Sequence, residues 1–205
     1  MRSRLAAAAL AGAALLAAGC GGDHEPTPTT PTIFKVRIPK GTRAVDVATA
    51  FSVAPGRAIT VAHAVGRHRT VVVAAPGQRA RRVRVLRTDR RLDLAELAVP
   101  DVRVPVFASE RVESGMYGFV QVLRGTVRLT VSAEILRTIT AAVRNAPPAA
   151  AQVRPALELR TIVAPGDSGA PVLDLSGRVI GMVFAQTYGR EDRAYAVDAS
   201  AFGGG

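Results

Sequence analysis

The chain has 205 residues, of which 48% are hydrophobic and 21% charged, so it can bury the core of one sizeable domain and is not wholly disordered. Its net charge is +11, and arginine supplies almost all of the positive charges. Aromatic residues make up only 4% and tryptophan is absent, which disfavours a nucleic-acid reader that stacks bases. One cysteine and three histidines exclude a disulfide framework and multi-cysteine or histidine-rich metal sites. We therefore expect no metal and no other cofactor.

Residues 1–19 have the composition of an export signal. Two arginines precede Leu5–Ala18, an uncharged run shorter than the roughly 20 residues of a membrane span. The sequence Ala17-Ala18-Gly19-Cys20 resembles the lipobox of bacterial lipoproteins, which implies cleavage before Cys20 and lipidation of its thiol. Residues 20–32 are rich in Pro and Thr and predict a tether. We expect lipid anchoring at the extracytoplasmic face of the bacterial membrane; the alternatives are an ordinary signal with secretion, or an uncleaved apolar anchor.

Short apolar segments separated by Gly and Pro predict an all-β sandwich or barrel over residues 33–205. Strict alternation in Arg82-Val83-Arg84-Val85 predicts a half-buried strand with arginine facing water. The Ala- and Pro-rich segment Ala141–Ala151 is interpreted as a loop. The predicted strands are Val45–Val53, Ala58–Ala62, Thr70–Ala75, Arg82–Arg87, Leu92–Val99, Tyr117–Leu123, Thr126–Ala133, Leu157–Ile162, Pro171–Leu175, Val179–Ala185 and Ala194–Val197.

The stretch Pro165–Pro171, PGDSGAP, contains a candidate nucleophile, Ser168. A nucleophilic serine needs a tight turn that exposes its hydroxyl, and backbone N–H groups beside it that can hold an oxyanion. Glycine close on both sides permits that backbone, and among eight serines only Ser168 is flanked in this way. A plain turn between two strands would give the same short pattern.

A nucleophilic serine also needs a base and a carboxylate that orients it. His63 ends an apolar strand in ITVAHAV, whereas His68 lies in a charged turn and is the weaker candidate. Asp93 begins the apolar segment LDLAELAV, where a buried carboxylate needs a partner. Asp89 and Asp101 lie in charged, turn-like surroundings and are expected to be solvated.

These three motifs resemble the catalytic His, Asp and Ser motifs of the trypsin-like (chymotrypsin-fold) serine proteases, in that family's order. The spacing, 30 residues from His63 to Asp93 and 75 from Asp93 to Ser168, is similar to that of compact, cysteine-poor bacterial members, including the HtrA type. The resemblance implies two six-stranded β-barrels, the first over about 33–108 and the second over about 114–202, with the triad at their junction.

The resemblance also implies the rest of the site. The backbone N–H groups of Gly166 and Ser168 would form the oxyanion hole. The residues implied for the substrate pocket are Ile162, Val163, Phe184, Ala185, Gln186 and Arg193. Since no carboxylate stands at the implied pocket base, small or medium apolar P1 residues are expected, or an acidic P1 if Arg193 turns inward. Ala170 replaces the second glycine of the usual GDSGGP.

The sequence therefore predicts an exported, lipid-anchored serine endopeptidase that acts on peptides or proteins, with a monomer favoured and no nucleic acid expected. The alternative is a silent binding protein with the same fold. Asp167 is expected to be buried and to pair with an arginine of the second barrel. Seven arginines between Arg79 and Arg91 are interpreted as a solvated strand face, with binding of an anionic lipid or cell-wall polymer as the alternative.

Overall fold

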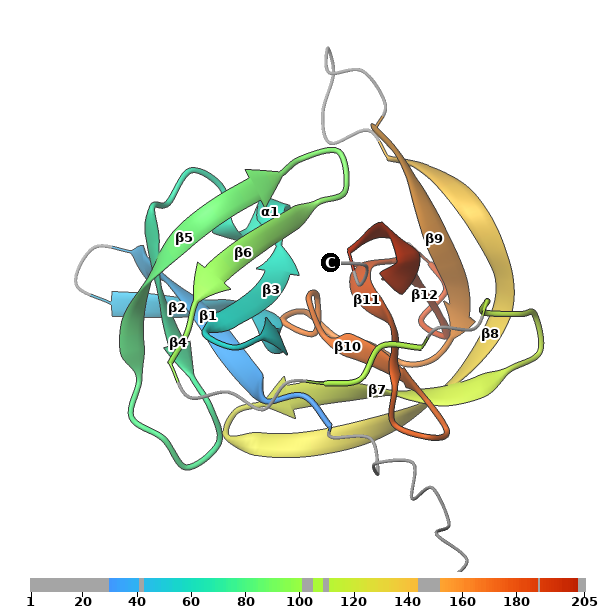
Figure 1. Cartoon of the computed structure of the whole chain (residues 1–205), viewed down its shortest axis with the longest axis horizontal. Helices are drawn as coiled ribbons and strands as arrows, with labels where there is room; N and C mark the ends of the chain where they lie inside the picture. The colour runs from blue at the N-terminus through green and yellow to red at the C-terminus, as the bar shows by residue number, and fades with distance from the viewer. Residues whose placement is uncertain are drawn as a thin grey trace, which may run out of the picture.

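The computed structural model describes residues 30–40, 43–100, 105–108, 111–143, 152–187 and 189–202. Within these ranges the chain forms two closed six-stranded antiparallel barrels that lie side by side (Figure 1). This confirms the all-β double-barrel fold. The predicted signal, Cys20 and most of the tether lie outside the described residues, as does Asp101.

The first barrel has the strand order β1-β2-β3-β6-β5-β4. Its strands are β1 (Ile33–Lys40), β2 (Arg43–Ala54), β3 (Arg57–Val61), β4 (Thr70–Ala74), β5 (Arg81–Asp89) and β6 (Leu94–Ala98). A single helical turn, α1 (Ala62–Val65), follows β3 directly. Val36, Phe51, Val61, Val71 and Leu97 fill the interior.

The second barrel has the order β10-β11-β12-β9-β8-β7. Its strands are β7 (Tyr117–Arg124), β8 (Val127–Val143), β9 (Gln152–Arg160), β10 (Pro171–Asp174), β11 (Val179–Gln186) and β12 (Arg193–Asp198), followed by the short helix η1 (Ala199–Ala201). Ile135, Leu157, Leu159, Val172 and Ile180 form its core. After η1, Phe202 packs edge-on against Phe51 of the first barrel, with ring centroids 6.4 Å apart, so the chain's end joins the barrels.

The sequence-based elements differ from the structure at β1 and at the end of β8. The strand β1 was not predicted, although it pairs with both β2 and β4 and so closes the first barrel. The loop prediction for Ala141–Ala151 is wrong at its start, because Ala141, Ala142 and Val143 continue β8. They pair with Arg154, Val153 and Gln152 of β9, so cross-strand hydrogen bonds outweigh the weak strand preference of alanine. Residues 144–151 lie outside the described residues.

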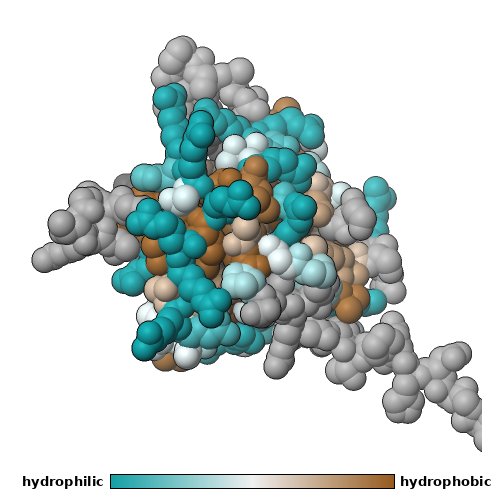
Figure 2. All heavy atoms as spheres, turned by 60° about the vertical axis from the view of Figure 1, so that its left-hand side comes forward, coloured by the Kyte–Doolittle hydropathy of each residue, from teal (hydrophilic) through white to brown (hydrophobic). Residues whose placement is uncertain are grey.

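The outer face of the first barrel is rich in arginine. Val83 is buried between the exposed Arg82 and Arg84, which confirms the predicted alternation. Figure 2 brings this side of the molecule forward and shows hydrophilic side chains spread over it beside apolar patches. All seven arginines of the predicted basic stretch are exposed: Arg79, Arg81, Arg82, Arg84, Arg87, Arg90 and Arg91. Among the described residues, no helix is both long and apolar enough to cross a membrane.

Candidate active site

His63 and Asp93 form a hydrogen-bonded pair in the first barrel. The imidazole Nδ1 lies 2.7 Å from Oδ2 of Asp93, and the backbone N–H of His63 donates to Oδ1 at 2.8 Å. The carboxylate is nearly buried, whereas 45% of the imidazole is exposed. An ionised carboxylate only accepts, so Nδ1 carries the proton and Nε2 is free to accept one. This is the arrangement that a general base with an orienting acid requires.

The local backbone explains how the pair forms. His63 lies in the single turn α1, directly after β3. Asp93 lies in the β5–β6 turn, just before β6 begins at Leu94, and not in a strand that starts at Leu92 as the sequence predicted. Asp93 has a φ of 59° and is the only non-glycine residue with a positive φ among the described residues. Aspartate tolerates this conformation better than most residues, and the carbonyl of Asp93 accepts the N–H of Ala62 at 2.9 Å. The turn and α1 are therefore held together by three hydrogen bonds.

The nucleophile turn depends on two glycines with positive φ. Gly166 has a φ of 94° and Gly169 one of 86°. A Cβ at Gly169 would stand 2.0 Å from the carbonyl oxygen of Thr49, so no side chain fits there. Ala170 has a negative φ, and its N–H donates to the carbonyl of Asp167 at 2.9 Å. The alanine that replaces the usual second glycine is therefore compatible with this turn.

Two backbone N–H groups of this turn are free. The N–H groups of Ala164, Asp167, Gly169 and Ala170 all donate within the protein. Those of Gly166 and Ser168 make no hydrogen bond to any described residue, nor does the Ser168 hydroxyl. Both N–H groups are thus available to a ligand, as an oxyanion hole requires.

Thr49, which the sequence analysis did not select, attaches the nucleophile turn to the first barrel. Its N–H donates to the carbonyl of Ser168 at 2.8 Å, and its hydroxyl donates to the carbonyl of Gly166 at 2.9 Å. Thr60, three residues before His63, donates its own hydroxyl to the carbonyl of Thr49 at 2.6 Å. This chain of contacts brings Ser168 of the second barrel to the strands that lead into His63.

Asp167 is buried and paired, as expected. Only 1% of its side chain is exposed, and Oδ2 lies 2.8 Å from Nη2 of Arg124 on β7. The same oxygen accepts the N–H of Ala164 at 2.8 Å. The predicted partner, an arginine of the second barrel, is confirmed as Arg124.

A cavity of about 520 Å³ lies beside the imidazole. It contains two residues of the expected substrate pocket, Phe184 and Ala185, together with Ala62, His63, Gly66, Thr88, Arg90 and Asp93. The other four expected pocket residues do not line it. Ile162 is 63% exposed and Val163 is buried. Gln186 is exposed and donates to the carbonyl of Glu191 at 3.2 Å, while Nη1 of Arg193 is buried with no hydrogen-bond partner among the described residues.

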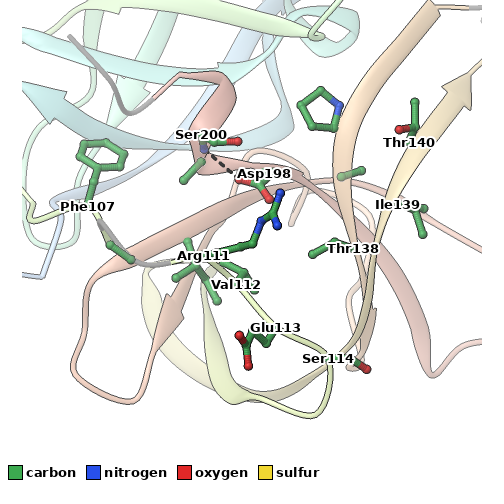
Figure 3. Close-up of a pocket in the computed structure, with 15 residues that line it drawn as sticks. Phe107, Arg111, Val112, Glu113, Ser114, Thr138, Ile139, Thr140, Asp198 and Ser200 are labelled. Carbon is green, nitrogen blue, oxygen red and sulfur yellow. Dashed lines mark hydrogen bonds between the residues drawn. The ribbon is translucent and has the colours of Figure 1, made fainter.

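A larger cavity, of about 1100 Å³, lies between the segment that joins the barrels and the long strands β8 and β9, and His63, Asp93 and Ser168 are not among the residues that line it. Figure 3 shows Arg111 and Glu113 on one side of it and Thr138 and Thr140 on the other. It contains none of the expected site residues. Within the described part of the chain, no group of histidine, cysteine and acidic residues is arranged to hold a metal.

A double barrel with an oriented histidine and a serine between glycines at the barrel junction defines the trypsin-like class. The sequence matches the trypsin-like peptidase domain over residues 48–182, and the chain belongs to that family. It is 30% identical to the serine protease Rv3671c of Mycobacterium tuberculosis in an alignment of 185 residues that covers 86% of this chain and 45% of that protein. The chain therefore spans about half the length of the curated relatives it matches.

Solved structures agree with this assignment. The active form of the Rv3671c protease superposes with a TM-score of 0.73 at 29% identity, over 84% of this chain and 78% of that one. The HtrA-type protease AlgW with a tripeptide gives a TM-score of 0.66 at 17% identity, over 84% of this chain and 57% of that one, and supports the fold alone.

Proposed function

We propose that this protein is an exported serine endopeptidase that uses His63, Asp93 and Ser168. The observation that carries the proposal is the pair of hydrogen bonds from His63 to Asp93, together with a glycine-flanked serine that Thr49 attaches to the same barrel. A match to a family alone would not distinguish an enzyme from a silent relative. Here all three reacting groups are present, and each has a role that fits its surroundings.

In the proposed mechanism, Oγ of Ser168 attacks the scissile carbonyl while Nε2 of His63 takes its proton. The N–H groups of Gly166 and Ser168 bind the oxyanion that forms, and Asp93 holds the imidazolium. His63 then gives the proton to the leaving amine, which breaks the C–N bond and leaves an acyl-enzyme. A water molecule, deprotonated by His63, releases the acid and restores Ser168.

A fluorophosphonate probe tests this proposal on the full chain. The probe should label the wild type at Ser168 and leave Ser168→Ala unlabelled. Ser176→Ala is the matched control, because Ser176 lies exposed in the β10–β11 turn, and it should label normally. A wild type that is folded but neither labelled nor active on any peptide would support the silent binding protein instead.

For substrate choice, we propose small or medium apolar P1 residues, since the two expected pocket residues that line the cavity, Phe184 and Ala185, are apolar. The one carboxylate among the cavity's lining residues, that of Asp93, already contacts His63. One observation favours an acidic P1 instead: Nη1 of Arg193 is buried without a hydrogen-bond partner among the described residues, and a substrate carboxylate could supply one. A library that varies P1 separates the two. Cleavage after Ala, Val or Leu supports the first, cleavage after Glu or Asp the second, and cleavage after Arg or Lys contradicts both.

We also propose that Cys20 carries the lipid anchor of the exported protein. Two or three acyl chains bind a membrane firmly, whereas one does so only marginally. Cys20→Ser should therefore release the protein into the medium or leave the precursor uncut, which fractionation and mass spectrometry would show. Membrane retention of a Cys20→Ser protein equal to that of the wild type would favour an uncleaved apolar anchor.

A further inference from the structure

Arg154, near the start of β9, crosses from the second barrel to the catalytic pair. Its side chain is 1% exposed, and Nη1 lies 3.5 Å from Oδ2 of Asp93. That oxygen is the one that also contacts Nδ1 of His63 at 2.7 Å. One carboxylate oxygen is therefore shared between an imidazole of the first barrel and a guanidinium of the second.

The guanidinium of Arg154 is incompletely hydrogen-bonded by its surroundings. Its Nε and Nη1 have no hydrogen-bond partner among the described residues, and the guanidinium lies 5.0 Å from the centre of the Phe184 ring. Burial lowers the pKa of Arg154, while the nearby carboxylates of Asp93 and, more weakly, Asp89 oppose that effect. Arginine stays charged at neutral pH even so.

Stability alone gives little reason for this residue. When an ion pair is buried, the desolvation free energy is about as large as the attraction between the charges. Apolar residues of similar size therefore often stabilise such positions better. A charged group that is buried, incompletely hydrogen-bonded and aimed at a catalytic carboxylate is better explained by an effect on that carboxylate.

We propose that Arg154 is a positioning residue for the catalytic pair. It holds Oδ2 of Asp93 from the side of the second barrel and places a positive charge beside the carboxylate oxygen that contacts Nδ1 of His63. The inference rests on the proposed serine peptidase function. Two further charged groups lie nearby at the β5–β6 end of the first barrel: Asp89 interacts with Arg154, and Arg90 lines the cavity beside His63 and Asp93.

The first test does not depend on activity. In full-length Ser168→Ala protein, the titration of the His63 imidazole is followed by NMR with and without Arg154→Met. Removing the nearby positive charge should move the titration midpoint to higher pH. Arg154→Lys, which keeps the charge, should move it much less. Arg160→Met, an exposed position on the same strand that pairs with Glu134, should leave it unchanged. If Arg154→Met does not fold, Arg154→Gln keeps a polar side chain there and gives the same readout.

An unchanged midpoint in folded Arg154→Met or Arg154→Gln would overturn the proposal. Because the experiment is done without the nucleophile, it remains decisive even if the wild type proves not to be a peptidase. Failure of the peptidase proposal would be seen separately, as a wild type that fluorophosphonate does not label.

The second test uses the active protein. Arg154→Met should lower kcat about 100-fold while KM changes less than about twofold, since a small displacement of the pair affects the chemical step more than binding. The acid limb of the kcat/KM profile should move to higher pH. Arg154→Lys should recover the wild-type acid limb and part of kcat. A variant that unfolds more easily but keeps the wild-type kcat and pH profile would show that Arg154 is only structural.

Discussion

The backbone conformation of Asp93 limits which residues can replace it. Its φ of 59° is unfavourable for most side chains, but asparagine, like aspartate, adopts it readily. We therefore expect Asp93→Asn to fold normally and to lower kcat by about 10⁴-fold, because an amide no longer selects the imidazole tautomer that carries its proton on Nδ1. Steady-state kinetics and circular dichroism measure the two effects.

The control for that prediction is Asp89→Asn. Asp89 accepts the N–H of Leu92 at 2.9 Å, a bond that an asparagine oxygen can also accept, so activity should stay close to that of the wild type. Retained activity in Asp93→Asn together with lost activity in Asp89→Asn would reassign the orienting acid.

Gly169 is the position in the nucleophile turn that cannot carry a side chain. In Gly169→Ala, the new Cβ would meet the carbonyl oxygen of Thr49 at 2.0 Å and the hydroxyl of Thr60 at 2.7 Å, at a backbone φ of 86°. We expect a loss of about 3 kcal/mol in the free energy of unfolding and no fluorophosphonate labelling. Ala170→Gly, one residue on at a negative φ, should cost less than about 1 kcal/mol and keep labelling. If denaturant titration gave Gly169→Ala and Ala170→Gly the same free energy of unfolding, this account would be wrong.

At the scale of elements, β7 supports the nucleophile turn through one ion pair. Arg124 is 40% exposed, whereas its partner Asp167 is 1% exposed, so removing the arginine leaves a buried carboxylate without its cation. Arg124→Met should lower the free energy of unfolding by about 2 kcal/mol and slow fluorophosphonate labelling about tenfold. Arg128→Met, at an exposed position on β8, is the matched control. Equal labelling rates for the Arg124 and Arg128 variants would rule out a role for β7 in shaping the turn.

The ion pair between Arg124 and Asp167 also indicates whether the protein must be cleaved to become active. Since the carboxylate of Asp167 already has a cation inside the second barrel, we expect the nucleophile turn to form without a new N-terminus. The uncut chain should react with fluorophosphonate as fast as a chain cleaved just before Ile33. Mass spectrometry shows whether the chain is cut. If fluorophosphonate labels the protein only after cleavage, the nucleophile turn does need a new N-terminus and the prediction is wrong.

Most strands could be predicted because their apolar residues recur between Gly and Pro turns, and these local signals agree with the barrels that form. Two features could not. The strand β1 follows a Pro/Thr-rich segment and contains Lys35 and Pro39, so only its pairing with β2 and β4 identifies it. The end of β8, Ala141-Ala142-Val143, begins an Ala- and Pro-rich segment and is extended because β9 pairs with it.

The candidate site likewise contains residues that could be predicted from the sequence and residues that could not. Ser168, His63 and Asp93 lie in short motifs whose chemistry can be read from neighbouring residues. Thr49 and Arg154 act through contacts between the two barrels, and nothing in their own surroundings in the sequence marks them. Their roles follow from the way in which the barrels pack.

At the scale of the whole molecule, the proposed reaction divides between the barrels: the first supplies His63 and Asp93, and the second supplies Ser168, Gly166 and Arg154. Besides the packing of Phe202 on Phe51, the junction contains hydrogen bonds from Thr49 to the nucleophile turn and an ion pair between Arg154 and Asp93. Neither barrel holds a complete set of reacting groups, so the three catalytic side chains should act as one unit.

This division predicts strong non-additivity. Ser168→Ala alone should lower kcat about 10⁶-fold, and adding His63→Ala or Asp93→Asn should lower it little further, because a base has no purpose without the hydroxyl it deprotonates. A residual rate above the uncatalysed one should remain, supplied by the Gly166 and Ser168 N–H groups and by substrate binding. Single, double and triple variants compared on one peptide measure this. If the losses multiply, the three residues act independently and the proposed triad is wrong; if His68→Ala lowers kcat as much as His63→Ala, the base has been assigned to the wrong histidine.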